Sequence, residues 1–199
     1  MASPPTTSAE IISQAITLTG KQQTVNTIDS GGPLAEDASK LYDLLVSAEF
    51  SSNRWRFAQT FQEISVINTL EPTFEGWQFY FQIPSDALMV LYVTPNVDYI
   101  LFGDRILTKS SQPNTLVYTH DVPVSKWPGA FSMYIVYHLA AMLGISVTNS
   151  DRLIARIDKG LQMWESRALF ADGQSSRTEQ FRFNPYKDVR YQSRNNRGR

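Results

Sequence analysis

The sequence predicts an α+β protein in which an antiparallel-type bundle of about four helices carries an inserted β-rich module and an extended C-terminal arm. Two observations predict this class. Apolar residues recur at helical spacing near both ends of the chain, whereas from Trp55 onward they alternate with a period of two. The β module is expected to be of sandwich or barrel type. We divide the 199 residues into N-terminal helices (1–54), the β module (55–121), C-terminal helices (122–174) and the arm (175–199).

The first helix is expected near 7–19 and begins at a capping box. Thr7 and Glu10 stand three residues apart, so the threonine hydroxyl can accept a backbone N–H while Glu10 reaches back to the cap. Gly20 provides a left-handed stop. A second helix is expected near 33–50, where an apolar stripe lies opposite charged residues. The members of that stripe are Leu34, Ala38, Leu41, Leu45 and Ala48.

Five or six short strands are expected in the β module. Alternation predicts one strand at 77–83, and a short apolar run between prolines predicts another at Ala87–Thr94. Tyr99–Phe102 and Arg105–Thr108 flank Gly103-Asp104, which is typical of a two-residue hairpin turn. Residues 116–119 read as a further strand.

Two helices are expected after the β module. Residues 127–150 contain no Asp, Glu, Lys or Arg, which suits either a membrane span or a helix buried in a bundle. His138 near the middle and Gly144 favour the buried helix. The last helix has a clear apolar stripe, made of Leu153, Ile154, Ile157, Leu161, Trp164 and Ala168.

Composition excludes several chemistries. The chain has no cysteine and two histidines, so disulfides, zinc ribbons, Fe–S clusters and thiol nucleophiles are excluded. It contains no G-x-S-x-G elbow and no glycine-rich phosphate loop. His120 and His138 are interpreted as structural histidines, each satisfied by a hydrogen bond. We therefore expect no enzyme activity, no metal and no cofactor.

A carboxylate pair for glycoside cleavage needs only two acids at a suitable separation. Glu71 and Glu75, in the loop 70–76, are the best candidates. A solvated loop explains them more simply, because the chain has 19 acidic residues and such neighbours arise by chance.

Charge is distributed unevenly along the chain. Residues 1–174 have a net charge of −6, whereas residues 175–199 have a net charge of +5. Arginine beside aromatic rings suits single-stranded nucleic acid or pockets on a protein partner. A segment that becomes ordered on a partner fits best, because purely disordered tails are poor in aromatic residues. The candidate binding residues are Phe181, Arg182, Phe183, Tyr186, Lys187, Arg190, Tyr191 and Arg194.

Five short motifs occur in a characteristic order: Leu41-Tyr42-Asp43, Trp55-Arg56-Phe57-Ala58, Ile83-Pro84-Ser85-Asp86, Val117-Tyr118-Thr119 and Trp127-Pro128-Gly129-Ala130-Phe131. Together with the helices around them, over 7–174, they resemble the tail tubular, or head-to-tail adaptor (connector), proteins of short-tailed bacteriophages.

The resemblance implies a non-enzymatic structural protein of the virion tail, made in the host cytoplasm. Such adaptors form rings, usually of twelve copies, between the portal protein and the tail nozzle protein. It also implies that genomic DNA passes through the ring without sequence-specific binding, which suits an acidic body. The basic arm is then expected to dock onto the portal. Two alternatives stay open: a muralytic tail protein that cleaves cell-wall glycosides, and a nucleic-acid-binding protein that uses the arm.

Overall fold

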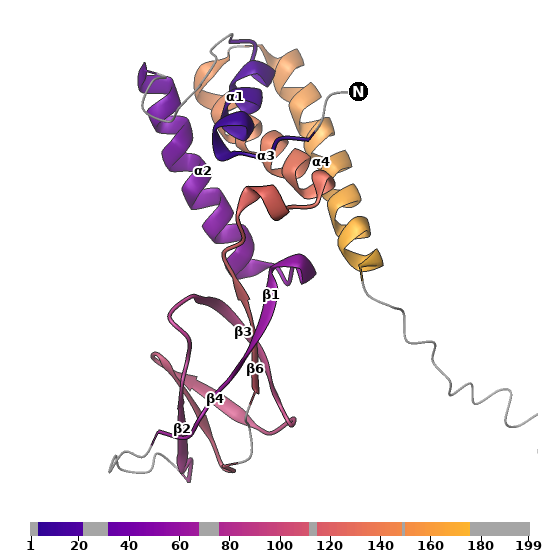
Figure 1. The fold of residues 1–199 in the computed structure, drawn as a ribbon. Helices are drawn as coiled ribbons and strands as arrows, with labels where there is room; N and C mark the ends of the chain where they lie inside the picture. Colours follow the sequence, from indigo (N-terminus) through magenta and orange to yellow (C-terminus); the bar gives the residue numbers. More distant parts are fainter. Residues whose placement is uncertain (1–3, 22–31, 68–75, 112–114, 149, 176–199) are drawn as a thin grey trace, which may run out of the picture.

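The computed structural model describes residues 4–21, 32–67, 76–111, 115–148 and 150–175. Within these ranges the protein is elongated, with helices at one end and strands at the other (Figure 1). The helices are α1 (Ser8–Leu18), α2 (Gly32–Ser52), α3 (Gly129–Val147) and α4 (Asp151–Gln174). The strands lie between α2 and α3 in the sequence. The predicted α+β class and the inserted position of the β module are confirmed.

Helix α3 is the core of the helical module. It packs against α1, α2 and α4, and its buried residues are distributed around its circumference. This explains why the segment is apolar on all faces. By length and composition α3 is also the one helix in the described residues that meets the criterion for a membrane span, but half of that window is buried against the other helices. We interpret it as a core helix.

The caps and stripes of the other helices follow the sequence closely. The capping box at α1 is present, and Gly20 has a positive φ of 85° where the helix ends. In α4 the inner face carries the predicted stripe, with Ile157 and Ala168 buried. The apolar stripe predicted for α2 is wrong at one position. Ala48 is exposed, because the face toward α3 is turned to bury Tyr42, Val46 and Glu49.

In the part of the chain that the structure describes, six strands form two three-stranded antiparallel sheets. One has the order β1–β6–β3, with β1 (Gln59–Glu63), β6 (Thr115–His120) and β3 (Ala87–Thr94). The other has the order β2–β5–β4, with β2 (Phe79–Gln82), β5 (Arg105–Thr108) and β4 (Tyr99–Phe102). The predicted hairpin at Gly103-Asp104 is confirmed, since Phe102 pairs with Arg105 and Gly103 has a φ of 61°. That the module is a sandwich or barrel stays a prediction.

The β module has a hydrophobic core of its own. Residues from both sheets contribute to it, among them Phe81, Ile106, Val93 and Leu116. The helical module has a separate and larger core. The described part of the chain therefore contains two packing units.

Two short crossings join the units. The first runs through a 3₁₀ turn, η2 (Arg56–Ala58), and the second through η3 (Val124–Lys126). Aromatic rings from both crossings meet the helical core: Trp55, Phe57 and Trp127 each lie 4.8–4.9 Å from the Phe131 ring centroid. In addition, the buried Thr119 hydroxyl donates to the Phe50 carbonyl at the end of α2 (3.0 Å). These contacts fix where the β module leaves the bundle.

Candidate interaction surfaces

The residues singled out for binding in the arm, Phe181 to Arg194, lie outside the described residues. So do Glu71 and Glu75, the candidate carboxylate pair. The structure therefore bears on other parts of the surface, and on the two histidines.

The two histidines differ in their environment. The His120 Nδ1 atom lies 2.9 Å from the Ala58 carbonyl oxygen, which agrees with a satisfied structural histidine at the end of a strand. The prediction is wrong for His138, whose buried Nδ1 atom has no hydrogen-bond partner among the described residues. It lies 3.6 Å from a carboxylate oxygen of Glu49. Packing of α3 against α2, rather than local sequence, brings these two side chains together.

Glu49 is a buried acid held between helices. The Tyr134 hydroxyl donates to Glu49 Oε1 (2.7 Å), and Asn53 Nδ2 donates to Oε2 (2.8 Å). Burial, followed by the hydrogen bond to Glu49, raises the pKa of the Tyr134 hydroxyl. Because the Tyr134 proton is held so firmly, this arrangement suits a fixed donor rather than a group that exchanges protons at neutral pH.

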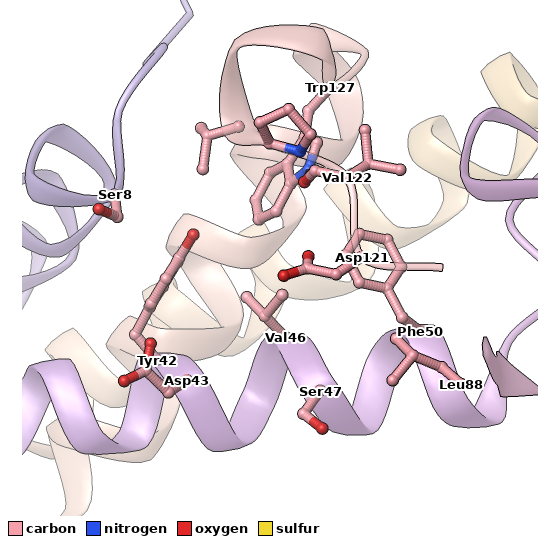
Figure 2. A pocket seen from close by; sticks show the side chains of 12 residues that line it. Ser8, Tyr42, Asp43, Val46, Ser47, Phe50, Leu88, Asp121, Val122 and Trp127 are labelled. Carbon is pink, nitrogen blue, oxygen red and sulfur yellow. The ribbon is translucent and has the colours of Figure 1, made fainter. Parts of the chain in front are cut away.

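A pocket of about 380 Å³ lies where α2 meets the second crossing (Figure 2). We call it the junction pocket. Helix α2 supplies Tyr42, Asp43 and Phe50, and the segment from β6 to η3 supplies Asp121; Trp127, just after η3, lines it as well. Ser8, Val46, Ser47, Leu88, Val122, Pro123 and Val124 complete the lining.

Polar groups from two elements face the junction pocket. Figure 2 shows the Tyr42 hydroxyl and the Asp121 carboxylate directed into the space between α2 and the crossing. Burial, and then the negative charges of Asp121 and Asp43, raise the pKa of the Tyr42 hydroxyl. The Trp127 indole N–H is already used, since it donates to the Val122 carbonyl (2.7 Å). The pocket thus combines negative charge with aromatic walls.

A second feature lies on the outer face of the β1–β6–β3 sheet. Phe61 pairs with Val117, and Val117 pairs with Tyr92, so the three residues form one row across the sheet. Phe61 is 73% exposed and Tyr92 is 51% exposed. They border a shallow hollow of about 240 Å³ together with threonine and glutamine side chains. We call this row the sheet patch.

Further apolar residues are exposed on α4. Met163 and Phe170, at positions i and i+7, lie on the same side of the helix, with Leu169 beside them. We call these three residues the α4 patch. The sheet patch and the α4 patch are on different modules, and an exposed apolar cluster of this kind marks an interaction site more often than a scattered residue does.

The described residues hold no group of three or more His, Asp or Glu side chains arranged to bind a metal ion. No family model matches the sequence, and no curated protein is significantly similar to it.

Sequence reasoning missed both the junction pocket and the sheet patch. Asp43 belongs to the charged residues expected opposite the apolar stripe of the second helix, and no role was assigned to Asp121, so nothing indicated that the two share a pocket. The sheet patch carries a weak signal: Phe61 is a large apolar residue between Thr60 and Gln62, within a strand that was not located. Its exposure depends on which face the other sheet covers, and that is a tertiary property.

Proposed function

We propose that the protein is a structural adaptor of a short-tailed phage virion, whose copies form a ring between the portal and the tail nozzle. The ordered motifs over 7–174 support this function, and the helical bundle with an inserted β module agrees with it. The observation that carries it is the sheet patch, because an antiparallel sheet normally presents polar side chains on its outer face.

A ring needs two different surfaces on each copy, one for each neighbour. The sheet patch and the α4 patch meet that requirement, because they are on separate modules of an elongated molecule. We propose that the sheet patch contacts the next copy in the ring. A two-fold dimer would instead need one self-complementary surface. Twelve copies are expected from the resemblance.

The remaining features fit a conduit for DNA. Residues 1–174 have a net charge of −6, so a lumen built from them repels phosphates and allows the genome to slide. In this proposal the arm docks onto the portal through Phe181, Phe183, Tyr186 and Tyr191, with Arg182, Lys187, Arg190 and Arg194 pairing with acidic grooves. The aromatic anchors are expected to matter more than exposed charge pairs.

The two alternatives make different predictions. A muralytic protein would clear a cell-wall zymogram, and Glu71→Gln or Glu75→Gln would abolish the clearing. A nucleic-acid-binding protein would bind DNA with a steep dependence on salt concentration, because several counterions are released. We propose that the protein does neither.

The experiment that tests the adaptor function is attachment to purified heads that lack tails, scored by electron microscopy. We expect the unchanged protein to form a ring at the portal vertex. The double variant Phe61→Ser with Tyr92→Ser is expected to stay folded, because both side chains are largely exposed, but to lose the ring.

Leu101→Ser is the matched control, since Leu101 is also an exposed apolar residue on a strand, at 53%, but belongs to the other sheet. Attachment of the control and failure of the double variant would support the proposal. If the unchanged protein does not bind heads at all, or if the double variant forms normal rings, the proposal is wrong.

A further inference from the structure

The junction pocket presents polar groups that have no hydrogen-bond or ion-pair partner among the described residues, and its occupant can be inferred from them. We propose that the junction pocket binds the chain's own C-terminal segment, residues 176–199, through an arginine flanked by aromatic rings. This inference goes beyond the adaptor function and does not rest on it, because it concerns the isolated protein.

Tyr42 is the first observation. The residue is only 7% exposed, yet its hydroxyl points into the pocket and has no hydrogen-bond partner among the described residues. The hydroxyl oxygen itself opens into the pocket, since it is not among the fully buried polar atoms that lack a partner in the described residues. An occupant that supplies a polar group can therefore reach it.

Asp43 and Asp121 are the second observation. They border the same pocket from two separate elements, and neither carboxylate has an ion-pair or hydrogen-bond partner within the described part of the chain. Both act on Tyr42, whose pKa they raise together with burial. Both carboxylates are exposed, so an occupant can reach them, and together with the phenol oxygen they suit one that is rich in donors. A guanidinium has five N–H donors in a planar fork and stays charged.

The walls of the pocket add the third observation. Tyr42 and Trp127 stack with their ring centroids 6.5 Å apart, and Phe50 lies 5.9 Å from Trp127. Aromatic faces attract a guanidinium and also pack against aromatic side chains. At about 380 Å³ the pocket is near the lower end of the range for ligand sites, which suits a few side chains rather than a large molecule.

The chain itself contains a segment with this chemistry. Residues 176–199 include seven basic and two acidic residues, and Phe181-Arg182-Phe183 places an arginine between two aromatic rings. Two contacts connect the end of α4, after which the segment follows in the sequence, to the wall of the pocket. The Asp172 carboxylate near the end of α4 accepts the Arg56 N–H (2.8 Å), and Phe57 beside Arg56 contacts Phe50 of the pocket wall (6.0 Å).

Tethering favours binding within one chain. Seven residues lie between Gln174 and Arg182, and the eight Cα–Cα steps allow a reach of roughly 25 Å. A short tether gives an effective concentration in the millimolar range, far above the micromolar concentration of a second copy in solution. We therefore assign the pocket to the segment of the same chain.

The absence of cysteine from the sequence makes a cross-linking test direct. Ser47→Cys places one thiol at the pocket, and Asn184→Cys places the other beside the Phe-Arg-Phe sequence. A short bis-maleimide is added to the full-length protein at micromolar concentration, and the rate of intramolecular cross-linking is measured by mass spectrometry. We expect Asp43→Asn with Asp121→Asn to slow this rate about three- to tenfold. High salt is expected to slow it as well.

Asp37→Asn with Asp158→Asn is the matched control, because both carboxylates are exposed on helices and neither borders the pocket. It should leave the rate unchanged. Arg182→Gln provides an independent test that cannot disturb the pocket itself, and it should slow cross-linking more than Arg197→Gln does. Equal rates for all variants would overturn the proposal, and so would a product that is only a cross-linked dimer.

Discussion

At the scale of single residues, Glu49 is the side chain whose environment is most demanding. A buried carboxylate is costly unless donors satisfy it, and here Tyr134 and Asn53 supply two hydrogen bonds. Asn53 follows α2 and Tyr134 belongs to α3, so the acid also ties the two helices together. Removing one donor should leave the carboxylate partly unsatisfied.

Tyr134→Phe tests this contact. It removes the hydroxyl but keeps the ring, so we expect a loss of about 1–3 kcal/mol in the free energy of unfolding. Tyr137→Phe, three residues later on the same helix, is the control and should change it by less than about 0.5 kcal/mol. Chemical denaturation of both variants measures the two values. A neutral Tyr134→Phe would mean that water replaces the lost donor.

The role of Glu49 was not predictable from the sequence. On its own helix it looks like one more acid of a charged face, next to Ala48, which the predicted stripe wrongly placed inside. Only the packing of α3, where Tyr134 and His138 follow each other at i and i+4, turns this position inward. The sequence contains one weak indication that Glu49 is buried, because Glu49 follows the buried Leu45 by one helical turn.

At the scale of elements, the contact between α3 and α4 depends on a glycine. A methyl group at Gly160 would lie 3.0 Å from Tyr137 Cζ and closer still to neighbouring ring carbons. At Gly173, in the same helix, a methyl group would meet nothing within 4 Å. Packing against Tyr137 therefore favours glycine at position 160, whereas no contact requires glycine at position 173.

Alanine substitutions separate these reasons. Gly160→Ala should destabilise the protein by about 1–2 kcal/mol, because overpacking outweighs the better helix propensity of alanine. Gly173→Ala should be neutral or stabilise it by up to about 1 kcal/mol. Thermal unfolding of the two variants gives the comparison. Similar stabilisation by both would show that the Tyr137 ring moves aside at little cost.

The capping box of α1 makes stability depend on pH. The Thr6 backbone N–H donates to Glu10 Oε2 (2.6 Å), and this hydrogen bond holds the pKa of Glu10 below its ordinary value. A lowered pKa means that the stabilisation is complete at neutral pH and is lost as the pH falls through the folded-state pKa.

Glu10→Ala should therefore lower the melting temperature at pH 7, and the difference from the unchanged protein should shrink below about pH 4. Glu36→Ala, at an exposed position of α2, is the control and should have little effect at either pH. A difference that stays constant from pH 7 to pH 3 would contradict the role of the Glu10 carboxylate in the cap.

At the scale of the whole molecule, the sequence was sufficient to predict the fold class and, among the described residues, the four helices and five of the six strands. Those features follow from local periodicity, caps and a glycine turn, which neighbouring residues determine. Strand β1 was not located, because Gln59–Glu63 has one large apolar residue and its pairing partner Thr115–His120 lies more than 50 residues away. The junction pocket could not be predicted from the sequence for the same reason, because it brings together residues about 80 positions apart.

Truncation after Gln174 tests how the arm relates to the folded body. The hydrophobic cores that the structure describes lie within residues 4–175, so we expect the truncated chain to stay folded, with a thermal transition lowered only by the loss of the proposed contact between the arm and the junction pocket. Attachment to tailless heads should be lost, because the proposed portal contacts are removed. Calorimetry and electron microscopy measure the two effects.

Substitutions within the arm refine this test. Phe181→Ala with Phe183→Ala should weaken attachment more than Arg197→Gln with Arg199→Gln, since buried aromatic anchors contribute more than exposed charges. If the truncated protein assembles normally onto heads, the portal contact must come from the helical bundle instead.

The pairing of Gln59 with Thr119 places the first and last strands of the β module side by side. The insertion therefore enters and leaves the bundle at almost the same point, and closing the gap from α2 to α3 requires only a short connection. Loop-closure entropy rises slowly with length, so a connection of about 60 residues costs only about 2 kcal/mol more than one of about six. We therefore expect that strands β1–β6 can vary in sequence, or be replaced as a unit, while the helices of the bundle keep their packing.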